Sequence, residues 1–194
     1  SWKVYVDGLA AAPGENPCAD DPTTQPANPV LWFASVATTS ECASQVAPGT
    51  QLATDLADPA AVAALSYLVP PADPAQADGW AQGVVEKIRG SKAYKDGGLI
   101  VIAADGSAAQ PVPAPGTATE PVAPAPAPVA APRLLLLSPF VTPGATLGEA
   151  VTPFTLTRTI EELFGLEPLA TPATKAAAPL DRSAFGAWTP TGGG

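Results

Sequence analysis

Apolar residues along the chain fall into a few short runs, separated by stretches rich in proline, alanine and glycine. Residues 2–6 are mostly β-formers and stop at Asp7-Gly8, which predicts a short strand followed by a turn. Residues 30–36 form the next apolar run, and their pattern leaves a strand and a short helix both open. Residues 65–69 lie between an alanine run and two prolines, which predicts a buried strand.

The strongest helix signal covers residues 74–89. Asp73 stands at the N-cap position, and Trp80, Val84 and Ile88 recur every four residues along one face. This face could line a ligand groove, but an aromatic residue at helical spacing usually belongs to a core. We therefore expect it to pack against the rest of the domain.

A second helix is expected over residues 153–164, with Thr152 as its cap. Glu161 and Glu162 are adjacent within it, and adjacent helix positions point in different directions. A shared acid–base pocket is therefore not expected. We expect both to lie on a solvated face, with Arg158 as the candidate partner of Glu162.

Two continuous apolar runs, at residues 99–102 and 134–137, predict strands that are covered on both faces. Together with the helices they favour an α/β layered architecture over a sandwich or a bundle. Between these runs, nearly every second or third residue of 108–132 is proline, which predicts polyproline II or disorder. The segment 170–194 has a similar composition, and we expect a flexible tail.

The length of 194 residues suits one ordinary domain, and much of the 46% hydrophobic content is alanine, which predicts a thin core. Nine Lys and Arg against 18 Asp and Glu give a formal charge of −9, so nucleic acid is not an expected partner. No run approaches the ~20 apolar residues that span a bilayer. Because the sequence begins abruptly inside an expected strand, a signal peptide or a whole upstream region is expected to precede it.

Cys18 and Cys42 lie in a loop-rich stretch, a pattern compatible with one structural disulfide, while two unpaired buried thiols are the alternative. A disulfide over such a loop would stabilise the fold by about 3 kcal/mol and would fit a secreted or extracytoplasmic protein. The chain contains no histidine to generate a thiolate, so a catalytic cysteine is not expected.

Four blocks of sequence follow one another in a fixed order. They read SWKVYV at 1–6 with NPVLWF at 28–33, QLATDL at 51–56 with LSYLVP at 65–70, SKAYKDGGLIVI at 91–102, and LLLLSPFV at 134–141 with TRTIEELFGL at 157–166. This order resembles the C-terminal half of the bacterial phosphoesterases, a family of the alkaline phosphatase superfamily that includes acid phosphatases, phosphatidylinositol-phosphate phosphatases and phospholipase C-like enzymes. The resemblance implies a partial alkaline-phosphatase-like layered sheet with flanking helices over residues 1–169, interrupted by the Pro/Ala-rich loop 108–132.

In such enzymes, metal ions held by carboxylates and imidazoles polarise a phosphoryl group for attack by a hydroxyl nucleophile. The family's acidic pair after the strand corresponds here to Asp105 and Gly106, so Asp105 is the one candidate metal ligand. A solvated loop aspartate is its alternative interpretation. The acid and histidine that precede the family's last helix fall on Thr152 and Pro153, and the nucleophile would lie upstream of residue 1.

These departures predict a degenerate phosphoesterase-like region, non-catalytic alone, with a binding or scaffolding role and no cofactor. We assign no catalytic residue, since Ser107 and Ser138 have no histidine partner. The alternative is part of a metal-dependent phosphoester hydrolase, in which a missing N-terminal half supplies the nucleophile and a divalent metal binds. A third hypothesis is a Pro/Ala-rich structural protein of the envelope. Substrate and other partners stay open.

Overall fold

The computed structural model describes residues 1–9, 16–18, 28–104, 133–144, 146, 151–171 and 175–181. The chain divides into two compact units, Ser1–Gly98 and Leu99–Gly194, and each is considered by itself. The expected boundaries at 169 and 170 stay predictions.

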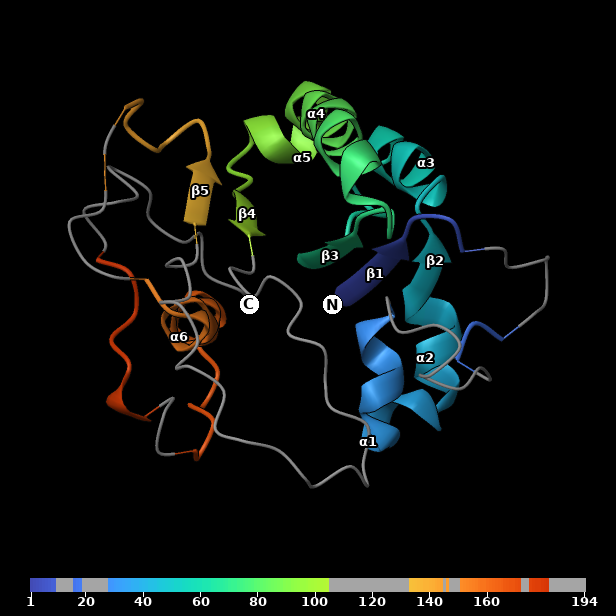
Figure 1. The fold of residues 1–194 in the computed structure, drawn as a ribbon, viewed down its shortest axis with the longest axis horizontal. Helices are drawn as coiled ribbons and strands as arrows, with labels where there is room; N and C mark the ends of the chain where they lie inside the picture. The colour runs from blue at the N-terminus through green and yellow to red at the C-terminus, as the bar shows by residue number, and fades with distance from the viewer. Residues whose placement is uncertain are drawn as a thin grey trace, which may run out of the picture. The chain divides into compact units, whose positions relative to one another are not determined.

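Among the described residues, three parallel strands form the sheet of the first unit (Figure 1). The strands are β1 (Trp2–Val6), β2 (Val46–Pro48) and β3 (Leu65–Val69), in the order β2-β1-β3. Val4 is in register with Val46 on one side and with Tyr67 on the other. Because β1 lies in the middle, the residues at its end are flanked by the ends of both neighbours.

Helices follow and connect these strands. They are the 3-10 helix η1 (Pro29–Trp32), α1 (Ala34–Ala37), α2 (Ser40–Gln45), α3 (Gln51–Ala57), α4 (Pro74–Gly90) and α5 (Lys92–Lys95). The apolar run at 30–36, for which strand and helix were both open, is therefore helical. Proline at the first position and the side chain of Asn28, which accepts from the backbone N–H of Val30, start η1.

Alternation along β1 divides the core between the two faces of the sheet. Val4 and Val6 point to one face, where η1 and α2 contribute apolar side chains, and Tyr5 points to the other, where α3 and α4 pack. Figure 1 shows α1 and α2 on one side of these strands and α3 and α4 on the opposite side. Helices on both faces of a parallel sheet confirm the predicted α/β class.

Cys18 and Cys42 form a disulfide with a Cα–Cα distance of 6.1 Å. Cys42 is completely buried, and both sulfurs belong to the apolar cluster that contains Val4 and Val6. The predicted disulfide is confirmed, and it fastens the segment 16–18 to α2.

The predicted strand at Leu65–Val69 exists, but the expectation that it is buried is wrong. Leu65 is 39% exposed and Tyr67 is 57% exposed, whereas Val69 is buried. The cause is the position of β3 at the edge of the three-stranded sheet, where it pairs with β1 alone among the described strands. An apolar run is compatible with a central or an edge strand, so its sequence did not distinguish them.

Helix α4 confirms the helix predicted over 74–89. The carboxylate of Asp73 accepts from the backbone N–H of Ala75 at 2.9 Å, as an N-cap does. Trp80, Val84 and Ile88 are half-buried, and Val84 packs against the cluster around Tyr5. The expected core role is therefore confirmed for Val84.

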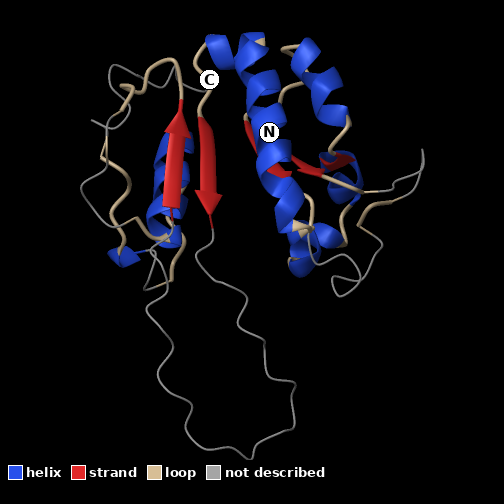
Figure 2. Cartoon of the chain, turned by 45° about the horizontal axis from the view of Figure 1, so that its top comes forward, coloured by secondary structure: helices blue, strands red, loops and turns tan. Residues whose placement is uncertain are grey.

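The described strands of the second unit, β4 (Ile100–Ala104) and β5 (Arg133–Leu137), pair antiparallel (Figure 2). Ile100 is in register with Leu137 and is buried, but Leu135 is 52% exposed. The expectation that both apolar runs are covered on both faces is wrong at Leu135, because an antiparallel pair can leave one face to solvent. The Pro/Ala-rich segment 108–132 lies outside the described residues.

Helix α6 (Pro153–Phe164) has the bounds predicted from the sequence. Thr152 and Thr155 form a reciprocal capping box, and Gly165 ends the helix with a φ of 62° in the left-handed region that glycine adopts without strain. Local signals at both ends therefore fixed this element.

The segment after α6 is hydrogen-bonded back to the helix. The backbone N–H of Leu169 donates to Glu161 at 2.9 Å, and that of Leu180 donates to the hydroxyl of Thr159 at 2.8 Å. Arg158 also pairs with Glu161 at 2.8 Å. The expectation that Glu161 lies on a solvated face is wrong, since only 5% of this residue is exposed. Its ion-pair partner Arg158 lies three residues earlier on the same helix.

Candidate functional site

The chain passes from β1 to β2 on one side of β1 and then returns to β3 on its other side. The topological switch point of the sheet therefore lies between β1 and β3. In open parallel sheets, ligands bind outside the carboxyl ends of the strands at such a point. Asp7 follows β1 directly, and its backbone N–H donates to the carbonyl of Val69 at 3.1 Å, which joins the ends of the two strands. Its carboxylate accepts from the indole N–H of Trp80 on α4 at 3.1 Å.

Gly49, directly after β2, lies close to Asp7. A Cβ at residue 49 would lie 3.3 Å from the Asp7 Cα and 3.5 Å from its Oδ1. The backbone N–H of Gly49 donates to the carbonyl of Val6 at 2.8 Å. The lack of a side chain therefore lets the end of β2 approach Asp7 closely.

Asp73 is the second carboxylate that follows a strand at this edge. It accepts from the side-chain amide of Gln76 at 3.0 Å and from the backbone N–H of Ala75. These hydrogen bonds, first that of Gln76, hold the pKa of Asp73 below its ordinary value. Asp7 and Asp73 are thus each engaged in a contact that fixes α4.

A buried polar network lies on the α3 side of the sheet. Asp55 of α3 is 5% exposed, and its carboxylate accepts from Lys3 at 2.6 Å, Tyr5 at 2.7 Å and Gln51 at 3.0 Å. Burial alone would raise the pKa of Asp55, but the hydrogen bonds from Gln51, Lys3 and Tyr5 lower it below its ordinary value. Burial, together with the bond to Asp55, raises the pKa of Tyr5 well above its ordinary value.

This network joins two of the four sequence blocks, SWKVYV and QLATDL, through a structural contact. The network was not predicted from the sequence. The signal was the alternation within β1, where Lys3 and Tyr5 share one face while Val4 and Val6 share the other. A polar pair on a buried strand face predicts a charged partner on the covering helix, although nothing local identifies that partner as Asp55.

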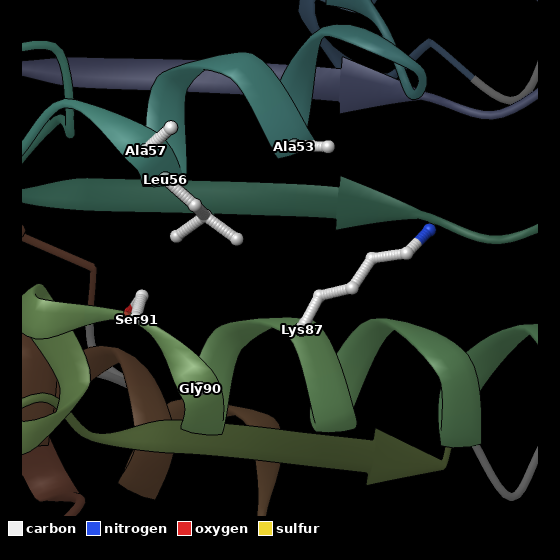
Figure 3. A pocket seen from close by; sticks show the side chains of 6 residues that line it. All are labelled: Ala53, Leu56, Ala57, Lys87, Gly90 and Ser91. Atoms are coloured by element: carbon white, nitrogen blue, oxygen red, sulfur yellow. The ribbon is translucent and has the colours of Figure 1, made fainter.

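An open apolar groove lies between α3 and α4 (Figure 3). Its volume is about 260 Å³, and it is lined by Ala53, Leu56, Ala57, Lys87, Gly90 and Ser91. In Figure 3 the side chains of Leu56 and Lys87 extend into the space between the two helices. The sequence had not indicated this groove, because α3 and α4 carry its residues in separate segments.

The predicted metal ligand Asp105 and its neighbour Gly106 lie outside the described residues, as does Ser107. Thr152 and Pro153, where the resemblance would place an acid and a histidine, are the cap and the first residue of α6. Ser138 accepts from the backbone N–H of Phe140 at 3.3 Å in a turn after β5. Within the part of the chain that the structure describes, no group of three His, Cys, Asp or Glu side chains is placed to hold a metal ion.

Comparison with known proteins identifies no relative: no family model, curated protein or solved structure matches this chain. Among the described helices, none has the length and apolarity required to cross a bilayer.

Proposed function

We propose that this chain is a phosphoesterase-like region without a catalytic metal site, and that it has a binding or scaffolding role. The observation that carries the proposal is the use of the carboxylates that the structure describes near the sheet. Asp7 binds Trp80, Asp73 caps α4, and Asp55 neutralises Lys3. With no histidine in the chain, the imidazoles that complete a phosphoesterase metal site are missing as well.

The order of the four sequence blocks supports an alkaline-phosphatase-like layering for the fold. Helices on both faces of a parallel sheet are compatible with that proposal. Thr152 supports the loss of the metal site, since the residue that replaces the family's acid has taken a capping role in α6.

We place the protein outside the cytoplasm. The Cys18–Cys42 disulfide supports this location, because disulfides persist in oxidising compartments and are rare in the cytosol.

The alternative proposal is part of a metal-dependent phosphoester hydrolase whose nucleophile is supplied by an upstream segment. It is favoured by the position of Asp105 directly after β4, which corresponds to the first acid of the family's metal-binding pair. The two proposals differ in one property, which is whether Asp105 contributes to phosphoester hydrolysis.

Hydrolysis of p-nitrophenyl phosphate tests both proposals when the chain is produced together with any segment that its gene encodes before Ser1, because the alternative places the nucleophile there. The assay is run with added Zn²⁺, Ca²⁺ or Mg²⁺, and with the Asp105→Asn variant as the matched control. The proposal predicts the same background rate for both proteins. A metal-dependent rate that Asp105→Asn abolishes would establish the hydrolase instead.

A further inference from the structure

We propose that the groove between α3 and α4 binds an unbranched acyl carboxylate, with the alkyl chain in the groove and the carboxylate on Lys87. This ligand would be the one bound in the binding role proposed above. The inference rests on the proposed function for that role, but not for the geometry of the groove. The groove belongs entirely to the first unit, so its geometry is independent of the predicted metal position at Asp105.

The shape of the groove comes from the small residues on its walls. Ala53 and Ala57 of α3 and Gly90 of α4 carry at most a methyl group, so the two helices leave an open channel between them. Leu56 adds an apolar surface that also packs against the core cluster around Tyr5. An open groove of about 260 Å³ can take up an unbranched alkyl chain, which then contacts the small apolar residues of both helices.

The polar groups that line the groove favour a ligand with a negative charge. Ser91 donates its hydroxyl to the carbonyl of Ile88 at 2.6 Å and accepts from the backbone N–H of Tyr94 at 3.2 Å, so its donor is already used. Lys87 has no ion-pair partner within the described part of the chain. Its ammonium is therefore the group in the groove that can bind an anion.

The charge around the groove differs from that of the chain as a whole. Four of the nine Lys and Arg residues, namely Lys87, Arg89, Lys92 and Lys95, fall within residues 87–95, although the chain carries a formal charge of −9. Lys92 pairs with Asp96, and Lys95 donates to the carbonyl of Gly90. With Glu86 and Asp96 counted, residues 86–96 carry a net charge of +2, which favours an anion here more than elsewhere on an acidic chain.

NMR titration of the full, isotope-labelled chain with octanoate and with octanol tests the assignment, in the presence of a chelator. We expect saturable shifts of the amides of the groove residues. Octanoate should bind about two- to fivefold more tightly than octanol, the size of one partly exposed ion pair. Lys87→Gln should abolish this preference, whereas Lys175→Gln, which removes the same charge from the second unit, should preserve it.

A second pair of variants tests the groove itself. A Cβ at Gly90 or at Gly79 meets no atom within 4 Å, so both positions of α4 accept a larger side chain. Gly90→Leu should fill the groove and abolish binding of both ligands, and Gly79→Leu should leave binding unchanged. Shifts that do not saturate, or equal affinity for octanoate and octanol, would overturn the inference. An unchanged preference in Lys87→Gln or normal binding in Gly90→Leu would overturn it as well. Because no metal or phosphoester is present, none of these outcomes decides the proposed loss of catalysis.

Discussion

Asp55 carries a buried negative charge in the first unit, and three neighbouring side chains stabilise it. Its side chain is 7% exposed and that of Lys3 is 20% exposed, so both charges are largely removed from water. Breaking such a pair leaves an uncompensated charge, which costs far more than the loss of a surface ion pair. The hydrogen bonds from Tyr5 and Gln51 add to this cost, because both donors would lose a charged acceptor.

We therefore predict that Asp55→Asn lowers the free energy of unfolding by about 3 kcal/mol, the scale of a broken buried pair. Urea unfolding followed by tryptophan fluorescence measures the change. Asp78→Asn, on the exposed surface of α4, is the matched control and should change stability by less than about 0.5 kcal/mol. A loss of stability in Asp55→Asn as small as that expected for Asp78→Asn would show that the network contributes nothing to stability.

The lowered pKa of Asp55 predicts how this stabilisation depends on pH. A carboxylate whose pKa is lower in the folded state stabilises the fold above its unfolded-state pKa, about 3.9 for aspartate, and the stabilisation is lost as the pH falls through the folded-state pKa. The difference in unfolding free energy between wild type and Asp55→Asn should thus be constant near neutral pH and should shrink in acid. A difference that grows as the pH falls would contradict the assigned network.

At the scale of elements, helix ends could be read from the sequence and strand environments could not. Asp73, Thr152 and Gly165 act on the backbone within a few residues, so their effects do not depend on the rest of the fold. The exposure of Leu65 and the burial of Glu161 depend on which segments pack nearby, and no local pattern contains that information. The groove between α3 and α4 was missed for the same reason.

The capping box of α6 gives a prediction at this scale. Thr152→Ala removes the hydroxyl that accepts from the backbone N–H of Thr155 at 3.1 Å, and should destabilise the first turn by about 1 kcal/mol. Hydrogen exchange of the amides at the start of α6 measures the effect within the second unit. Thr152→Ser keeps the hydroxyl and should retain protection, so equal exchange in the two variants would argue against the capping role.

At the scale of the whole molecule, the Cys18–Cys42 disulfide is a covalent cross-link between two segments of the chain. It joins segments 24 residues apart, and in the chain-entropy model a bond of this loop length restricts the unfolded state. We predict that Cys18→Ser with Cys42→Ser lowers the unfolding free energy of the first unit by about 3 kcal/mol. Urea unfolding of this variant and of the chemically reduced wild type should give matching losses. Unchanged stability in both would remove the structural role of the bond.

The proposed function depends partly on residues that the structure describes and partly on positions outside them. The strands at 2–6 and 65–69, the two helices with clear caps and the disulfide followed from sequence signals that are local or compositional, whereas β2, α2, α3 and α5 were not predicted. The candidate metal ligand Asp105 could be proposed only through the resemblance, and it follows β4 beyond the described residues. The chain contains no histidine, and this holds whatever its fold.

Metal binding by the purified chain tests the proposed loss of the metal site most directly. Equilibrium dialysis against Zn²⁺, Ca²⁺, Mg²⁺ and Mn²⁺, followed by mass spectrometric metal analysis, gives the number of ions bound per chain. If the metal site is lost, each metal should bind at far less than one ion per chain, with no difference between wild type and Asp105→Asn. One ion per chain that is lost in Asp105→Asn would contradict the proposed loss.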